Sequence, residues 1–121
     1  PPLFEMPDAP AAGPAVRPAV PDPALQALAD ALRARWGGRL FLGTSSWHFP
    51  GWAGQVWDRA HPAERLSREG LAAYAAHPLL RTVSLDRAFY RALDAAEATR
   101  LAAQARAAAP GFRFVVKAPA L

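Results

Sequence analysis

The residues of this sequence that could do chemistry stand where three short apolar segments end. Lys117 and Asp86 close two of these segments, and Thr44 and Ser45 follow the third. A lysine ammonium can hold an anion or, when desolvated, form a Schiff base, and a carboxylate can act as a general base or bind a metal ion. Lys117 and Asp86 are therefore the candidate catalytic residues, and Thr44 and Ser45 are candidate substrate-binding residues. The alternative is that Lys117 and Asp86 form a structural ion pair and that the two hydroxyls only satisfy the end of a strand.

Aromatic side chains accompany these polar residues in the predicted loops. Trp47, His48 and Tyr90 are candidate substrate-binding residues, because aromatic faces can stack on sugars or bases and an imidazole can shuttle protons near neutral pH. We expect Trp47 and Tyr90 to line a pocket and Trp52 to be more structural. In the alternative interpretation, Phe49 and these rings pack on one another and close the end of the domain.

A repeated order of helix and strand must position these residues. Asp22 and Pro23 form a helix start, and leucines at three- and four-residue spacing give that helix an apolar stripe that should pack on the domain. Ser67 can cap a second helix, and Asp94 a third, alanine-rich one. The pattern predicts helices over 23–36, 67–77 and 94–109 and strands over 39–43, 82–86 and 112–117, the first strand being mostly buried.

Alternation along the second and third strands predicts which side chains share a face. Val83 and Leu85 should face the helices, which leaves Ser84 and Asp86 on the opposite face. On the third strand, Phe112, Phe114 and Val116 should face the helices, with Val115 and Lys117 opposite. If these strands are neighbours, Asp86 and Lys117 lie within reach of an ion pair.

Strands that alternate with helices predict an α/β fold with a parallel sheet and right-handed crossovers. The second and third strands start about 31 residues apart, close to one eighth of the roughly 250 residues of a closed barrel. We therefore expect a partial TIM-type (β/α)8 barrel: its first three β-strands with intervening helices, preceded by an N-terminal helix. In such barrels the active site lies at the C-terminal ends of the strands. An open α/β sheet is the alternative.

Length and composition bound the function. The chain has 121 residues, a net charge of +4 and no cysteine, which excludes disulfides and thiolate zinc sites. Its thirteen arginines are scattered, so nucleic-acid binding is possible but not favoured. No apolar run approaches a membrane span and no secretory signal is present, so we expect a cytoplasmic location and no membrane contact. No cofactor, metal-ligand spacing or oligomeric state is indicated. Residues 1–21, rich in proline and alanine, are predicted to be a disordered tail.

Three motifs resemble those of the domain of unknown function 72 (DUF72) family, also called YecE-like. They are GTSSWHFPGW at 43–52, TVSLDRAFYR at 82–91 and FRFVVKAP at 112–119. The resemblance covers residues 40–119 and implies that residues 22–121 are the N-terminal part of a truncated TIM-type barrel from a bacterial or archaeal protein. The activity of this family is not established, so the resemblance implies a fold rather than a reaction.

The sequence departs from the family pattern at four positions. Ser84 stands where the family has a glutamate, and Asp86 where it has an asparagine. Ser46 replaces a glycine and Phe49 a tyrosine. If that glutamate is an acid or base in relatives, this chain has lost it or Asp86 has replaced it. Three functions stay open: an enzyme acting on a small polar or anionic substrate, a nucleic-acid-binding barrel, and a non-catalytic scaffold or inactive fragment.

Overall fold

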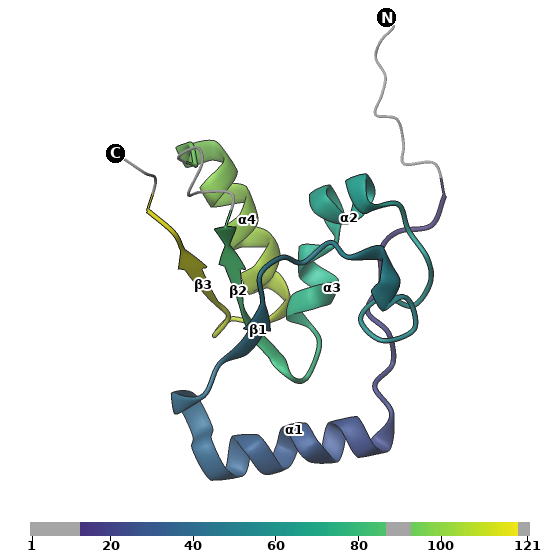
Figure 1. The fold of residues 1–121 in the computed structure, drawn as a ribbon, viewed down its shortest axis with the longest axis vertical. Coiled ribbons are helices and arrows are strands. Elements are labelled where there is room, and N and C mark those ends of the chain that lie inside the picture. The colour runs from purple at the N-terminus through teal and green to yellow at the C-terminus, as the bar shows by residue number, and fades with distance from the viewer. Residues whose placement is uncertain (1–12, 87–92, 119–121) are drawn as a thin grey trace, which may run out of the picture.

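The computed structural model describes residues 13–86 and 93–118, and Figure 1 shows their arrangement. A three-stranded parallel sheet has helices against one face. Within the described ranges no helix is both long enough and apolar enough to cross a bilayer. The elements are α1 (Pro23–Trp36), η2 (Gly37–Arg39), β1 (Leu42–Thr44), η3 (Pro50–Trp52), α2 (Ala63–Glu69), α3 (Leu71–Ala75), β2 (Leu80–Leu85), α4 (Ala95–Ala108) and β3 (Arg113–Val116).

The sheet has the strand order β1-β2-β3, and both pairings are parallel, as the sequence predicted. Parallel neighbours place the ends of all strands at one edge of the sheet. β1 and β2 meet at an irregular register, with Gly43 opposite Thr82. A Cβ on Gly43 would lie 1.9 Å from the Thr82 carbonyl oxygen, so only glycine fits this contact. The sheet confirms the α/β class with its parallel strands.

The first strand differs from its prediction. It was expected over 39–43 and mostly buried, but it spans Leu42–Thr44, and the Leu42 side chain is 41% exposed. The two glycines after α1 allow a tight 3-10 turn that takes up Arg39, so the strand begins later. Among the described strands only β2 pairs with β1, which leaves its outer edge open.

The second predicted helix is also different. The expected helix over 67–77 is two short helices, α2 and α3, and Ser67 lies inside α2 rather than capping it. Pro62 is the N-cap residue of α2, which therefore begins at Ala63, four residues before Ser67. Gly70 then separates the two, and a Cβ there would lie 2.6 Å from the Leu66 carbonyl oxygen. A glycine therefore marks the break between the two helices.

The caps of α1 and α4 confirm the sequence analysis. The Asp22 carboxylate accepts a hydrogen bond from the Leu25 amide at 2.8 Å, and Asp94 accepts from the Glu97 amide at 2.7 Å. α1 lies across the end of the sheet at which the strands begin (Figure 1). Its leucine stripe packs only in part, because Leu28 is 51% exposed and Ala29 is the one buried residue of the helix.

The core fills the space between the sheet, α3 and α4. Val83 and Leu85 of β2 are buried, whereas Ser84 between them is partly exposed, so the predicted alternation is confirmed. On β3, Phe114 and Val116 line a hollow with Leu101 of α4, which places them on the helix side as expected. Further large side chains that are almost fully buried are Trp57, Leu66, Leu71, Tyr74 and Phe112.

The segment before α1 is held to the domain, although residues 1–21 were predicted to be a disordered tail. Residues 1–12 lie outside the described residues. The Ala19 amide donates to the Val56 carbonyl at 2.9 Å, and the Asp58 amide donates to the Arg17 carbonyl at 3.0 Å. Pro18 forms an antiparallel bridge with Trp57, and Val16 packs against the core. Order therefore starts earlier than the proline content indicated.

Candidate functional site

Asp86 and Lys117 lie together where β2 and β3 end. The last pair in register is Leu85 with Val116, and each of the two charged residues follows one of these partners. The Lys117 ammonium nitrogen (Nζ) is 3.8 Å from Asp86 Oδ1, which confirms the predicted ion pair. Their side chains are 55% and 41% exposed. The pair is thus a surface feature of the strand ends.

Ser84 joins this pair from the same face of β2. Its hydroxyl donates a hydrogen bond of 2.5 Å to Asp86 Oδ1. Residues two apart on a strand point to the same side, so a short serine can reach the carboxylate beyond it. The Ser84 hydroxyl therefore orients the Asp86 carboxylate, a role that the sequence alone did not assign to it.

The distance between Lys117 and Asp86 shows how strongly these two charged groups interact. A direct ammonium–carboxylate hydrogen bond is about 2.7–2.9 Å long, so the separation between Lys117 and Asp86 is that of a loose pair. Loose, exposed pairs contribute little to stability, roughly 0–1 kcal/mol. Both groups consequently keep hydrogen-bonding capacity that a ligand could use.

At the end of β1, Thr44 is part of a partly buried hydrogen-bond network. The Thr44 amide donates to the Tyr74 hydroxyl oxygen at 2.9 Å, and the Tyr74 hydroxyl donates to the Thr82 carbonyl at 2.9 Å. The Thr44 hydroxyl donates to the Ser46 carbonyl at 2.6 Å. Burial raises the pKa of Tyr74, and its hydrogen bonds to Thr44 oppose that rise only in part. Thr44 is thereby fixed in place, while Ser45 is exposed beside it.

Tyr74 is the residue that sequence reasoning missed here. It comes from α3, where its spacing identified it only as an apolar position of a helix. In the structure its hydroxyl links β1 to β2 behind the strand ends. A tyrosine at a buried helix position was the available signal, because a buried phenol needs a hydrogen-bond partner.

The aromatic candidates occupy different environments. Trp47 is 3% exposed and its indole nitrogen donates to the Ser67 carbonyl at 3.3 Å, so its ring belongs to the core rather than to a pocket wall. His48 is partly exposed and meets the Trp47 ring edge-on, with 5.8 Å between ring centroids. Trp52 packs against Trp57 and Tyr74, as expected for a structural ring. Tyr90 lies outside the described residues.

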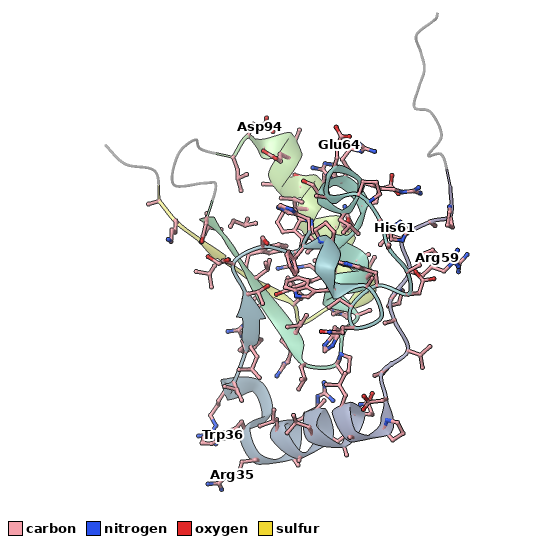
Figure 2. All side chains as sticks on the ribbon, turned by 45° about the vertical axis from the view of Figure 1, so that its right-hand side comes forward. Arg35, Trp36, Arg59, His61, Glu64 and Asp94 are labelled. Carbon is pink, nitrogen blue, oxygen red and sulfur yellow. The ribbon has the colours of Figure 1, made fainter. Side chains whose placement is uncertain are left out.

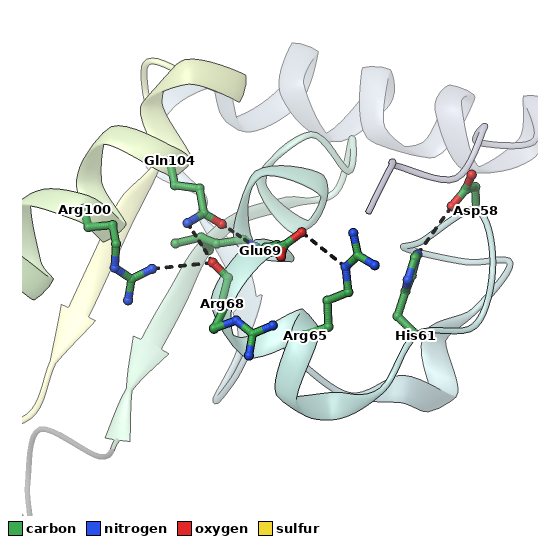
Figure 3. A network of polar contacts seen from close by, with 8 residues as sticks. Asp58, His61, Arg65, Arg68, Glu69, Arg100 and Gln104 are labelled. Atoms are coloured by element: carbon green, nitrogen blue, oxygen red, sulfur yellow. Dashed lines mark hydrogen bonds and ion pairs between the residues drawn. The ribbon is translucent and has the colours of Figure 1, made fainter. Parts of the chain in front are cut away.

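A second group of polar side chains lies beside α2, away from the strand ends (Figures 2 and 3). His61 is buried, and its Nε2 is 3.9 Å from Asp58 Oδ1. Arg65 pairs with Glu69 at 3.2 Å. Gln104 of α4 donates to the Arg68 carbonyl and accepts from the Leu71 amide, which bridges the break between α2 and α3. These contacts tie the helices together.

Two further features bear on where a ligand could bind. A hollow of about 330 Å³ lies at the opposite edge of the sheet, where the strands begin, between Arg33, His77 and Pro110. Burial lowers the pKa of His77, whose Nδ1 accepts from the Leu79 amide at 3.1 Å.

In the part of the chain that the structure describes, no three histidine, aspartate or glutamate side chains gather as a metal site would require.

The family model described as "Protein of unknown function DUF72" matches residues 41–121, about two thirds of the chain. The chain belongs to the DUF72 family. No curated protein and no solved structure matches it. The DUF72 match confirms the resemblance drawn from the three motifs and includes all the candidate site residues. α1 and the segment before it precede the DUF72 match.

Proposed function

We propose that this DUF72 chain forms part of a (β/α)8 barrel that binds, and acts on, a small polar or anionic substrate at the C-terminal ends of its strands. The observation that carries the proposal is the approach of Lys117 to Asp86, 3.8 Å apart at the ends of neighbouring parallel strands. Parallel α/β sheets bind ligands at this edge. The same edge carries the Thr44 and Ser45 hydroxyls at the end of β1.

Lys117 is the anion-binding group in this proposal. A Schiff-base lysine is activated by a desolvated apolar pocket, whereas the Lys117 side chain is 55% exposed. An exposed ammonium suits a point-charge contact to a carboxylate or phosphate instead. Asp86, held by Ser84, is the group that would accept a proton or a hydrogen bond from the substrate.

His48 and Ser45 are proposed as secondary contacts. His48 is partly exposed in the loop after β1, and Ser45 is exposed directly after the strand. Trp47 is left out of the contact surface because its ring is buried. A cytoplasmic location belongs to the same proposal, as the setting for a small metabolic substrate.

The nucleic-acid alternative has weaker support because several arginines already have aromatic or carbonyl partners. The guanidinium groups of Arg81 and Arg113 each lie 4.4 Å from the centre of the Phe41 ring, and Arg81 also donates to the Gly37 carbonyl. Arg35 lies over Trp36 at 5.1 Å. A nucleic-acid interface needs free cations in a continuous patch.

The test uses the natural protein that contains residues 1–121, with propionate and inorganic phosphate as probes in ligand-observed NMR. Lys117→Met should weaken the binding of the anion by about tenfold, the loss of one charge-assisted contact. Arg106→Gln, which removes an exposed arginine of α4, is the charge-matched control and should bind like the native protein. Equal binding by the native protein and Lys117→Met, with unchanged circular dichroism, would refute the proposal.

A further inference from the structure

The group formed by Lys117, Asp86 and Ser84 places a positive charge beside a negative charge, which restricts the ligands it can accept. A site for simple anions would present cations and amides alone. Here a carboxylate lies 3.8 Å from the ammonium and is oriented by a hydroxyl. A bound anion would therefore approach a negative group, which costs binding free energy unless the ligand also gives Asp86 a donor.

Asp86 has the capacity to accept such a donor. A carboxylate has two oxygens with about four lone-pair directions. The contacts from Ser84 and Lys117, among the described residues, both go to Oδ1. The second oxygen thus offers an acceptor next to the Lys117 ammonium, on a side chain that is 41% exposed.

The spacing of the two protein groups limits the spacing of the two ligand groups. A hydroxyl donates to a carboxylate at about 2.6 Å and an ammonium donates to a carboxylate at about 2.8 Å. Since Lys117 and Asp86 are only 3.8 Å apart, a ligand that contacts both must hold its donor and its anion close together. Groups on adjacent carbon atoms meet this condition.

The charge of Lys117 also decides which donor fits. A ligand ammonium placed at Asp86 would lie within a few ångströms of the Lys117 ammonium, and like charges at such distances repel. A neutral hydroxyl can make the same hydrogen bond without that repulsion. The arrangement consequently favours a hydroxyl over an amine.

We infer that the site selects a 2-hydroxy carboxylate, whose carboxylate contacts Lys117 and whose hydroxyl donates to Asp86, with Ser84 positioning that aspartate. This inference rests on the proposed function, because it assumes that Lys117 binds the anion. It adds the chemical class of the ligand. Ser84 contacts the substrate through Asp86 only and is a positioning residue.

The experiment uses the natural protein that contains residues 1–121 and compares three ligands with the same three-carbon skeleton: lactate, propionate and alanine. Dissociation constants come from ligand-observed NMR at pH 7. Lactate should bind about fivefold more tightly than propionate, as expected for one added hydrogen bond to a charged group in a partly exposed site. Alanine should bind no more tightly than propionate.

Variants locate the origin of the preference. Asp86→Asn should lower the ratio of the propionate to the lactate dissociation constant while propionate still binds. The charged acceptor is replaced by the weaker amide carbonyl of asparagine, and the anion is no longer repelled. Ser84→Ala should reduce the same ratio by a smaller factor, because Asp86 keeps its charge and loses only the hydroxyl that orients it. Arg106→Gln should keep the native ratio.

The outcomes separate the two proposals. Equal binding of lactate and propionate by the native protein, or a preference of undiminished size in Asp86→Asn, overturns the hydroxy-acid inference and leaves the anion site standing. Tighter binding of alanine than of lactate also overturns it, because the donor would then be charged. Absence of binding for all three ligands and for inorganic phosphate overturns the proposed function itself.

Discussion

Replacing Tyr74 with phenylalanine should destabilise the chain by about 2 kcal/mol. The substitution keeps the buried ring and removes only the hydroxyl that accepts from the Thr44 amide and donates to the Thr82 carbonyl, each at 2.9 Å. A buried polar group that loses its partner costs about 1–3 kcal/mol. Thr44 and Thr82 are partly exposed, which lets water compensate in part, so about 1 kcal/mol for each group is the reasonable value.

Urea unfolding followed by circular dichroism measures this loss. With a slope of about 2 kcal/mol per molar urea, the midpoint for Tyr74→Phe should fall by about 1 M. Thr44→Val is the comparison variant. It removes the Thr44 hydroxyl, with its contact to the Tyr74 hydroxyl and its bond to the Ser46 carbonyl, and leaves both bonds between Tyr74 and the backbone in place. Its effect should be smaller. A change below about 0.5 kcal/mol for Tyr74→Phe would show that the hydroxyl does not join the strands.

The same tyrosine predicts a dependence on alkaline pH. Burial raises the pKa of Tyr74 above its ordinary value of 10.0. The folded protein therefore keeps the phenol protonated up to a higher pH than the unfolded chain does. The resulting stability is fully present below pH 10 and is lost as the pH rises through the raised value. Tyr74→Phe should remove that alkaline loss, and a native-like alkaline transition in the variant would contradict the assignment.

Three further predictions concern the frame around the site. Gly43→Ala should destabilise the chain by more than about 2 kcal/mol, because its Cβ would lie 1.9 Å from the Thr82 carbonyl oxygen. Gly38→Ala is the control, because nothing lies within 4 Å of a Cβ there. Equal unfolding midpoints for the two variants would refute the close contact. Burial lowers the pKa of His77, so its contribution to stability should be complete above about pH 6.5 and decline as the pH falls toward the lowered value. His77→Gln should reduce this acid-side decline in the free energy of unfolding. An unchanged decline would exclude His77 as its source. Asp94→Ala should cost about 1 kcal/mol through loss of the cap on the Glu97 amide, whereas a cost near zero in thermal unfolding would show that the cap is dispensable.

Local chemistry made part of this structure predictable. The caps at Asp22 and Asp94 depend on residues three apart, and the alternation of Val83 and Leu85 depends on neighbours in one strand. The ion pair between Asp86 and Lys117 required one further assumption, that the second and third strands pair in parallel, and that pairing is present.

Other features depend on contacts between distant segments, which residue periodicity does not encode. The Tyr74 hydroxyl has partners on two strands, one 30 residues before it and one eight residues after it, beyond the three- and four-residue spacing of a helix. Trp47 follows a strand in a loop, a position typical of a ligand contact, but it is covered by neighbouring elements and bonded to the Ser67 carbonyl. Residues 16–19 were expected to be disordered because proline prevents local hydrogen bonds, yet Val56 and Asp58 supply partners from elsewhere.

The contact between Gly43 and Thr82 has a consequence for how the chain selects its final pairing. A slip of one residue between β1 and β2 would exchange the faces of every side chain on the moving strand. Such a slip would also place Leu42 or Thr44, each with a Cβ, where only a glycine fits, and would separate the Tyr74 hydroxyl from one of its partners. Steric exclusion and hydrogen bonding thus reject the same misaligned states. Gly43 and Tyr74 together therefore favour a single register of β1 and β2. That register fixes the positions of Ser84 and Asp86.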